Sequence, residues 1–210
     1  MYDDITGIIL SGGKSTRMGE NKSLLKIGNK SIIESVRDLM QSLFPDVILI
    51  TNNPEEYQFL EMKIFKDIFF RMGPLAGIHS GLTHSTTKKN FVISCDIPLM
   101  TAQMISYLVS YKTDKLITVA KADGFIQQLC GLYNKDCIPY ASEILSNQIN
   151  SDEGNPEQKK RGCKVLGLID LVGAEIIDAE KVPFYKKDIF FNMNKKEDFN
   201  FIKSHLEYSL

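Results

Sequence analysis

Residues 5–22 read Ile-Thr-Gly-Ile-Ile-Leu-Ser-Gly-Gly-Lys-Ser-Thr-Arg-Met-Gly-Glu-Asn-Lys. The run from Ile5 to Leu10 is typical of a strand buried in a parallel sheet, and Ser11-Gly12-Gly13 ends it. Adjacent glycines let backbone N–H groups approach a ligand and form an anion-binding nest. Three cations follow for polyphosphate oxygens: Lys14, Arg17 and Lys22. The stretch therefore predicts a buried strand that leads into a phosphate-binding loop.

Two common nucleotide-binding patterns do not fit this loop. Gly13-Lys14-Ser15 suggests a P-loop, but that motif needs glycine at position 8, where the chain has Ile8. The dinucleotide pattern G-x-G-x-x-G is also absent here. From the residues alone, a solvated loop with incidental cations stays an open alternative.

The rest of the chain alternates between strand and helix patterns. Strands are expected at residues 47–50, 62–65, 91–95, 116–120, 128–133, 174–179 and 190–192. Helices are expected at residues 31–43, 75–82, 135–147, 158–171 and 195–206, and another begins at Thr101. Ser31 and Glu34 form an expected capping box for the first helix. Such alternation implies right-handed βαβ units, with 116–120 and 128–133 as an antiparallel exception.

We therefore expect residues 1–210 to form a single α/β domain. Its architecture would be a three-layer α/β/α sandwich with a Rossmann-like, mostly parallel sheet. The polar stretch 147–162 is interpreted as a surface loop and not as a domain boundary.

Composition excludes several classes of protein. The chain has 210 residues, 43% of them hydrophobic, and a formal net charge of −1, so it has no global basic field for nucleic acid or a membrane surface. Its acidic start, Asp3-Asp4, is unlike a signal peptide, and we expect a cytoplasmic location. The four cysteines are far apart and predict neither a disulfide framework nor a zinc site.

In an open parallel sheet, ligands bind beyond the carboxyl ends of the strands. Candidate site residues are therefore the polar residues at those ends, which are 11–22, Asn52, Asn53, Asp67, Asp96, Asn192 and Asn194. Asp96 follows an apolar strand and suits Mg²⁺, which favours one or two carboxylates plus phosphate oxygens. The simpler alternative is that Asp96 caps the following turn.

Four motifs in order along residues 5–199 carry a family resemblance. Residues 10–22 resemble the loop L-x-G-G-x-S-x-R-M-G-x-D-K of the nucleotidyltransferases that act on small acceptors, with Asn21 as the departure. Residues 73–78, G-P-L-A-G-I, resemble a motif of the molybdenum cofactor guanylyltransferase branch. Residues 95–98 are similar to its metal-binding C-D-x-P, and 192–194 to its late N-x-N.

The resemblance implies an enzyme that transfers GMP from GTP to molybdopterin, the organic part of the molybdenum cofactor, with Mg²⁺ as cofactor and pyrophosphate as the second product. It assigns catalysis to Arg17, Lys22 and Asp96, with Asp96 as the metal ligand. The implied nucleotide-binding residues are Leu10, Ser11, Gly12, Gly13, Lys22, Asp67 and Asp96. Asn192 and Asn194 would contact the acceptor, although ordinary turn roles stay open for both. Cofactor-insertion proteins and molybdoenzymes are the implied protein partners, with no nucleic acid and no membrane.

Alternatives remain at this point. Gly73, Gly77 and Gly81 suit close helix–sheet packing as well as ligand approach. The N-x-N motif lacks the usual following Thr-Pro, and Gln127-Gln128 stand where H-P or Q-P is usual, so the acceptor contacts are less well supported than the GTP contacts. Rival functions are a CTP-dependent or sugar-phosphate nucleotidyltransferase and a catalytically silent GTP-binding protein. Gly12 argues against the cytidylyl branch, whose loop more often has alanine there.

Overall fold

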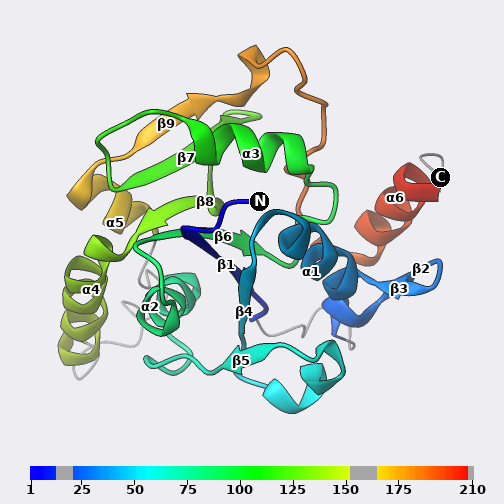
Figure 1. The fold of residues 1–210 in the computed structure, drawn as a ribbon. Coiled ribbons are helices and arrows are strands. Elements are labelled where there is room, and N and C mark those ends of the chain that lie inside the picture. The colour runs from blue at the N-terminus through cyan, green and yellow to red at the C-terminus, as the bar shows by residue number, and fades with distance from the viewer. Residues whose placement is uncertain (13–20, 152–164, 208–210) are drawn as a thin grey trace.

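One seven-stranded sheet organises the chain. The structure is a computed structural model that describes residues 1–12, 21–151 and 165–207. Within these residues the strand order is β5-β4-β1-β6-β8-β7-β9 (Figure 1).

The first half of the sheet is parallel and is built around β1 (Ile5–Leu10). β1 pairs on one side with β4 (Asp46–Ile50) and on the other with β6 (Lys89–Ser94), and β5 (Lys63–Phe65) adds to β4. All six residues of β1 are buried. This explains the continuous apolar run, because a strand covered on both faces has no solvent side.

The second half contains a hairpin. β7 (Ile117–Ala122) and β8 (Phe125–Asn134) pair antiparallel, and β8 also pairs antiparallel with β6, while β9 (Glu175–Asp178) is parallel to β7. Both connecting residues, Asp123 and Gly124, have positive φ angles of 52° and 78°. An Asp-Gly pair favours this hairpin geometry. Among the described strands of this sheet only β8 is reversed, which confirms a mostly parallel sheet.

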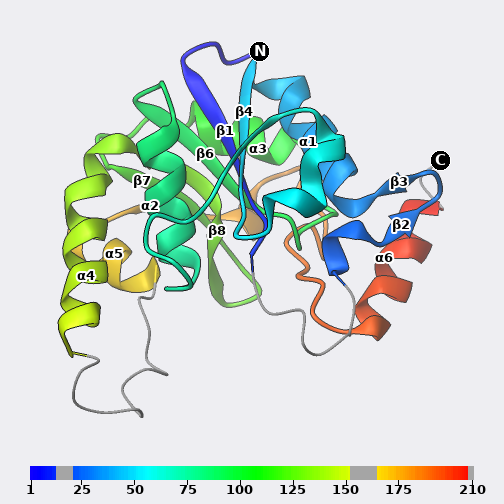
Figure 2. The same cartoon turned by 90° about the horizontal axis from the view of Figure 1, so that it is seen from below.

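Helices cover both faces of the sheet and give the expected three layers (Figures 1 and 2). α1 (Ile32–Leu43) and α3 (Ala102–Ser110) lie on one face. The other face carries α2 (Pro74–His84), α4 (Ile138–Ser151) and α5 (Val165–Val172).

The predicted start of α1 is confirmed. The Glu34 backbone N–H donates to Ser31 Oγ at 3.4 Å, and the Ser31 backbone N–H donates to Glu34 Oε2 at 2.7 Å. This reciprocal pair satisfies two donors at the helix start.

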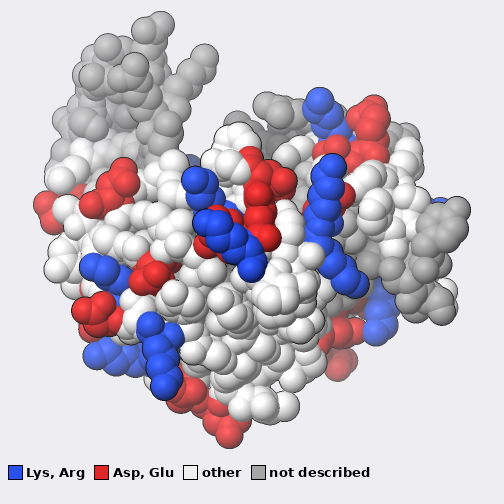
Figure 3. Space-filling model, turned by 90° about the horizontal axis from the view of Figure 1, so that it is seen from above, with Lys and Arg blue, Asp and Glu red and all other residues white. Residues whose placement is uncertain are grey.

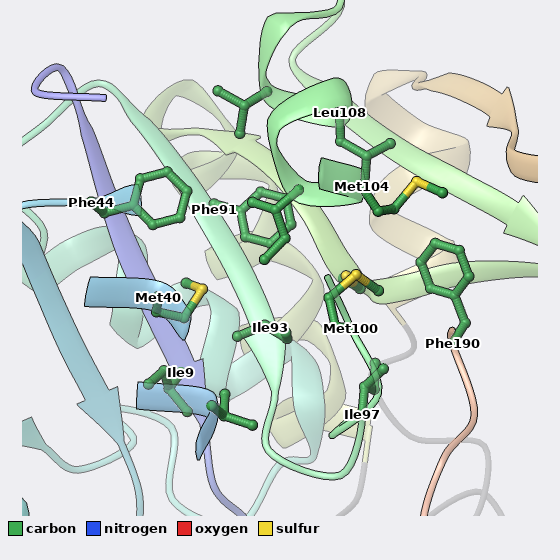
Figure 4. Packing of buried hydrophobic residues seen from close by; sticks show 14 of the residues in the cluster. Ile9, Met40, Phe44, Phe91, Ile93, Ile97, Met100, Met104, Leu108 and Phe190 are labelled. Carbon is green, nitrogen blue, oxygen red and sulfur yellow. The ribbon is translucent and has the colours of Figure 1, made fainter. Parts of the chain in front are cut away.

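Alternating side chains of the strands supply the two cores. Ile9 packs with α1 and α3, whereas its neighbour Ile8 packs with α2 and α4. Figure 4 shows the first core, where Phe44 stacks on Phe91 with ring centroids 5.8 Å apart. Fully buried Met40 and Met104 belong to the same core.

A smaller unit lies beside the main sheet. The hairpin of β2 (Lys26–Ile27) and β3 (Lys30–Ser31) packs against α6 (Lys196–Glu207) (Figures 1 and 2). A third cluster joins them through the buried side chains of Ile32, Met193 and Ile202. The C-terminal helix is thereby attached to the beginning of α1.

Two sequence expectations need correction, and a third is tested only in part. Residues 190–192 do not form a strand, because the Phe191 N–H turns back to Asp188 O at 2.8 Å and Asp188 has a positive φ of 71°. Residues 147–151 belong to α4 and not to a loop. Of the helix expected at 158–171, the described part is helical as α5, and residues 158–164 lie outside the described residues.

The surface matches the balanced composition. Basic and acidic side chains lie side by side on the face drawn in Figure 3, as the net charge of −1 leads one to expect. Within the described ranges, no helix combines the length and apolarity that crossing a membrane requires.

Gly131 in β8 is predicted to be intolerant of a side chain. A Cβ there would lie 2.5 Å from the Thr118 backbone oxygen and 2.7 Å from Val119 Cγ1. We expect Gly131→Ala to lower the free energy of unfolding by about 1–3 kcal/mol. The control Gly167→Ala, in α5, where no described atom lies within 4 Å of the added Cβ, should raise it by roughly 0.5–1 kcal/mol. Urea unfolding measures both, and equal effects would contradict the packing argument.

Candidate functional site

The carboxyl ends of β5, β4, β1 and β6 are in register. Leu10 lies opposite both Ile50 and Ser94, and Ile50 lies opposite Phe65. Two backbone hydrogen bonds continue the pattern past the end of β1: Ser11 N–H to Ile50 O at 2.9 Å and Cys95 N–H to Leu10 O at 3.0 Å. The polar residues that follow these strands therefore emerge at one edge.

Lys22 and Asp96 are brought together at this edge by the backbone of Met193. The Lys22 Nζ donates to Met193 O at 3.3 Å, and the Met193 N–H donates to Asp96 O at 2.8 Å. Met193 is fully buried in the cluster shared with α6. Its neighbours Asn192 and Asn194 are exposed. Because Met193 contacts both Lys22 and Asp96, the N-x-N motif lies beside these two candidate residues.

The pKa of the Asp96 carboxyl group is subject to opposing effects of burial and of a nearby cation. Burial raises its pKa, while hydrogen bonding by Ser94, its own backbone N–H and the charge of Lys22 act in the opposite direction. Its Oδ1 atom is buried and has no hydrogen-bond partner among the described residues. Such an acceptor is costly unless a ligand satisfies it.

This orphaned oxygen fits the expected magnesium. Mg²⁺ is usually held by one or two carboxylates together with substrate phosphates and water. The described residues contain no cluster of three or more His, Cys, Asp or Glu that could hold a metal without substrate. Asp96 is therefore the residue that would hold Mg²⁺, with the remaining ligands left to substrate and water.

Asp67 and Asn52 form a second polar pair at the same edge. The Asn52 Nδ2 donates to Asp67 Oδ2 at 2.7 Å. Burial raises the pKa of Asp67, and the hydrogen bond from Asn52 partly opposes this. Asp67 follows β5 and Asp96 follows β6, three strand spacings away, which is about 14 Å.

The glycines of residues 73–81 have backbone and packing roles. Gly73 precedes α2 with φ 81°, a conformation that favours glycine. A Cβ on Gly81 would lie 2.6 Å from Ile8 Cγ2, and one on Gly77 would lie 3.3 Å from Leu10 Cδ2. Close helix–sheet packing therefore explains Gly77 and Gly81, and it brings α2 to the end of β1.

Gly12 differs from these glycines. Its φ lies outside the left-handed region, and a Cβ there would meet no atom within 4 Å among the described neighbours. Neither the turn nor packing within this part of the protein requires glycine at position 12.

The remaining predicted residues are placed as follows. Leu10 and Ser11 are buried at the end of β1, whereas Gly13 and Arg17 lie outside the described residues. Burial raises the pKa of the Cys95 thiol to about 12, so this cysteine is not an activated nucleophile.

Two contributors were missed by sequence reasoning. The sequence could have pointed to Met193, because it is the middle residue of the N-x-N motif. No sequence pattern points to Tyr57, whose hydroxyl lies 2.7 Å from Ser11 Oγ, because its position depends on contacts between residues that are distant in the chain.

Removal of the Asn52 amide is predicted to raise the pKa of Asp67 further. Because a raised pKa penalises the ionised form, Asn52→Ala should cost nothing extra through Asp67 below the ordinary pKa of aspartate. Its cost should appear as the pH rises through the folded pKa, reaching about 1.5 kcal/mol near pH 7. Carboxyl ¹³C titration measures the pKa of Asp67. Urea unfolding below the ordinary pKa of aspartate and at pH 7 measures the cost in stability. With Asp67→Asn as the background, the pH dependence of the Asn52→Ala effect should vanish; its persistence would exclude Asp67 as the source.

Comparison with known proteins supplies the family. Residues 7–154 match the MobA-like NTP transferase domain. The chain is 35% identical over 194 residues to a probable molybdenum cofactor guanylyltransferase of Clostridium perfringens, covering 91% of this chain and 92% of the relative. A protein of the same name from Carboxydothermus hydrogenoformans is 31% identical over 198 residues, with 93% of each chain covered.

A solved structure shares the fold. It is molybdopterin-guanine dinucleotide biosynthesis protein A from Archaeoglobus fulgidus, with a TM-score of 0.78 at 18% identity, covering 97% of this chain and 99% of that one. The expected fold class is thereby confirmed. Together with the sequence matches, these likenesses establish that the chain belongs to the MobA-like NTP transferase family and is a nucleotidyltransferase.

Proposed function

We propose that this enzyme transfers GMP from GTP to the terminal phosphate of molybdopterin in the molybdenum cofactor and releases pyrophosphate. The observation that carries the proposal is the joining of Lys22 and Asp96 by the Met193 backbone at the sheet edge. The names of the relatives point to the same acceptor and nucleotide. The proposal treats the chain as one domain that acts in the cytoplasm.

The reaction needs no protein nucleophile. An oxygen of the acceptor phosphate forms a bond to the α-phosphorus of GTP, and the bond from that phosphorus to the bridging oxygen of the β-phosphate breaks. The phosphate monoester is already ionised near pH 7, since its second pKa is near 6, so no general base is required. The chain's task is therefore to align two anions and to neutralise charge.

Lys22 and Asp96 suit the phosphate end of the site. The Lys22 ammonium would bind the outer phosphates and stabilise the departing pyrophosphate. Asp96 would hold Mg²⁺ through its unpartnered Oδ1, and bound Mg²⁺ would neutralise phosphate charge. Arg17 belongs to the same proposal through its place in the motif, although it lies outside the described residues.

Asp67 and Asn52 suit the nucleoside end. Guanine presents N–H donors on its pairing edge, and ribose presents hydroxyl groups. The Asp67 carboxylate accepts such donors, and the buried Asn52 Oδ1 has no hydrogen-bond partner among the described residues. No atom of the described residues lies within 4 Å of a Cβ at Gly12, which supports room for a large base and so favours GTP over CTP.

The direct test incubates the protein with molybdopterin, Mg²⁺ and one of the four NTPs, and measures pyrophosphate and the dinucleotide. We expect GTP to be preferred. Preference for CTP, or transfer to a sugar phosphate instead of molybdopterin, would favour a rival transferase. Tight GTP binding without any product would favour the silent binding protein.

Loss of the Asp96 charge is predicted to remove most turnover without unfolding the protein. Asp96→Asn keeps the shape and removes a carboxylate whose burial is unfavourable, so the melting temperature should not fall. The control Asp46→Asn makes the same change at the opposite end of β4, where the carboxylate pairs with Lys63 at 2.9 Å. Product formation should survive in the control, and near-normal turnover by Asp96→Asn would exclude the metal role.

Lys22→Met is predicted to weaken GTP binding by tenfold or more, because one charge-assisted contact contributes about 1.5–3 kcal/mol. GMP lacks the β- and γ-phosphates, so its affinity should change much less. Calorimetry with both nucleotides separates the cases, with exposed Lys26→Met as control. Equal losses for GTP and GMP would show that Lys22 does not bind the outer phosphates.

A further inference from the structure

The hydroxyl group of Tyr57 connects the end of β1 to the segment that carries Lys22. Tyr57 lies in η2 (Pro54–Leu60), and its ring is buried in the main core with only 3% of the residue exposed. Its oxygen lies 2.7 Å from Ser11 Oγ, 2.8 Å from Asn21 Nδ2 and 2.9 Å from Ser23 Oγ. Ser11 follows β1, while Asn21 and Ser23 stand on either side of Lys22.

The directions of these hydrogen bonds follow from one fixed donor. The Ser23 backbone N–H points to Asn21 Oδ1 at 3.2 Å, so this atom must be the amide oxygen. The Ser23 hydroxyl donates to the same oxygen at 2.8 Å, and therefore accepts from the Tyr57 hydroxyl. Tyr57 then accepts from both Asn21 Nδ2 and Ser11 Oγ. A phenol has one donor and two acceptor positions, and all three are used.

Glu56 completes the arrangement around Asn21. The Asn21 amide also donates to Glu56 Oε2, next to the hydrogen bond that it donates to Tyr57. An aspartate at position 21 would have no N–H for either acceptor and would place a second carboxylate against Glu56. Asn21 and Glu56 are thus a matched pair.

We propose that Tyr57 is a positioning residue that fixes Lys22 relative to the carboxyl end of β1, and that Glu56 makes asparagine the required residue at position 21. Met193 O fixes the far end of the Lys22 side chain, whereas the Tyr57 network fixes its backbone. The expected effect on GTP binding rests on the proposed function of Lys22, whereas the positioning of Lys22 by Tyr57 does not.

The first experiment removes the hydroxyl and keeps the ring. Tyr57→Phe should raise the KM for GTP about tenfold, because it removes a buried hydroxyl whose donor and acceptor positions are all hydrogen-bonded. The effect on GMP binding should be smaller. The control is Thr87→Val, which removes a hydroxyl bonded to Thr6 and Lys89 at the amino ends of β1 and β6. Both variants should lose stability, but only Tyr57→Phe should change the KM for GTP.

Amide hydrogen exchange of Ser23 in the ligand-free protein gives a readout that does not depend on GTP. Its N–H is bonded within the network, so Tyr57→Phe should speed its exchange about tenfold, and Thr87→Val should not. If Ser23 exchange changes as expected but no nucleotide affinity does, the proposed function of Lys22 fails and the positioning geometry stands. Unchanged Ser23 exchange in Tyr57→Phe would overturn the positioning role.

The second experiment tests the pairing of Asn21 with Glu56. Asn21→Asp should lower kcat/KM for GTP about tenfold through the apposed carboxylates. In the double variant Asn21→Asp/Glu56→Gln the glutamine amide donates to the new carboxylate, and the Tyr57 hydroxyl turns its proton toward it. Activity and Ser23 protection should then return to within about threefold of the wild type, a coupling of the size that contacting residues show. A double variant no better than Asn21→Asp, or full activity in Asn21→Asp, would overturn the pairing.

Discussion

β1 is hydrogen-bonded on both sides by parallel strands, and this double pairing determines where the candidate site lies. With Leu10 opposite both Ile50 and Ser94, the chain must leave β1, β4 and β6 at the same level. A shift of one residue in either pairing would turn the β1 side chains to the wrong faces and exchange the two cores. Burial of Ile8 and Ile9 on opposite faces resists such a shift. The hydrophobic core thereby places Asp67 and Asp96 along one polar edge.

The C-terminal region completes this edge, although it lies outside the main sheet. Met193 reaches Lys22 and Asp96 with its backbone, and its side chain is buried beside Ile32 and Ile202. Packing of α6 against β2 and the start of α1 therefore bears directly on the candidate site. A backbone contact does not depend on the identity of residue 193, but its placement depends on that buried side chain.

Much of this arrangement could be predicted from the sequence, because it rests on local patterns. The run 5–10 predicted β1, and Ser31 with Glu34 predicted the capping box; both are confirmed. The strand predicted at 190–192 was wrong, because a run of only three residues, two apolar and one polar, does not distinguish a strand from consecutive turns. Tyr57 was beyond sequence reasoning, since its partners are 34 to 46 residues away in the chain. The site roles themselves stay predictions, because they depend on ligands.

The two half-buried carboxylates, Asp67 and Asp96, have neighbours of different kinds, which suit them to different tasks. A polyanion that approaches Asp67 and Asp96 meets two acids whose pKa values are raised by burial, so each needs compensation. The charge of Lys22 acts on Asp96, which leaves that end of the edge suited to phosphates with a divalent cation. Among the described residues, Asp67 receives only the neutral Asn52 amide, an environment that favours uncharged N–H and O–H donors and disfavours phosphate. In the proposed reaction, one cation and one amide among the described residues thus favour a nucleotide with its phosphates toward β6 and its nucleoside toward β5.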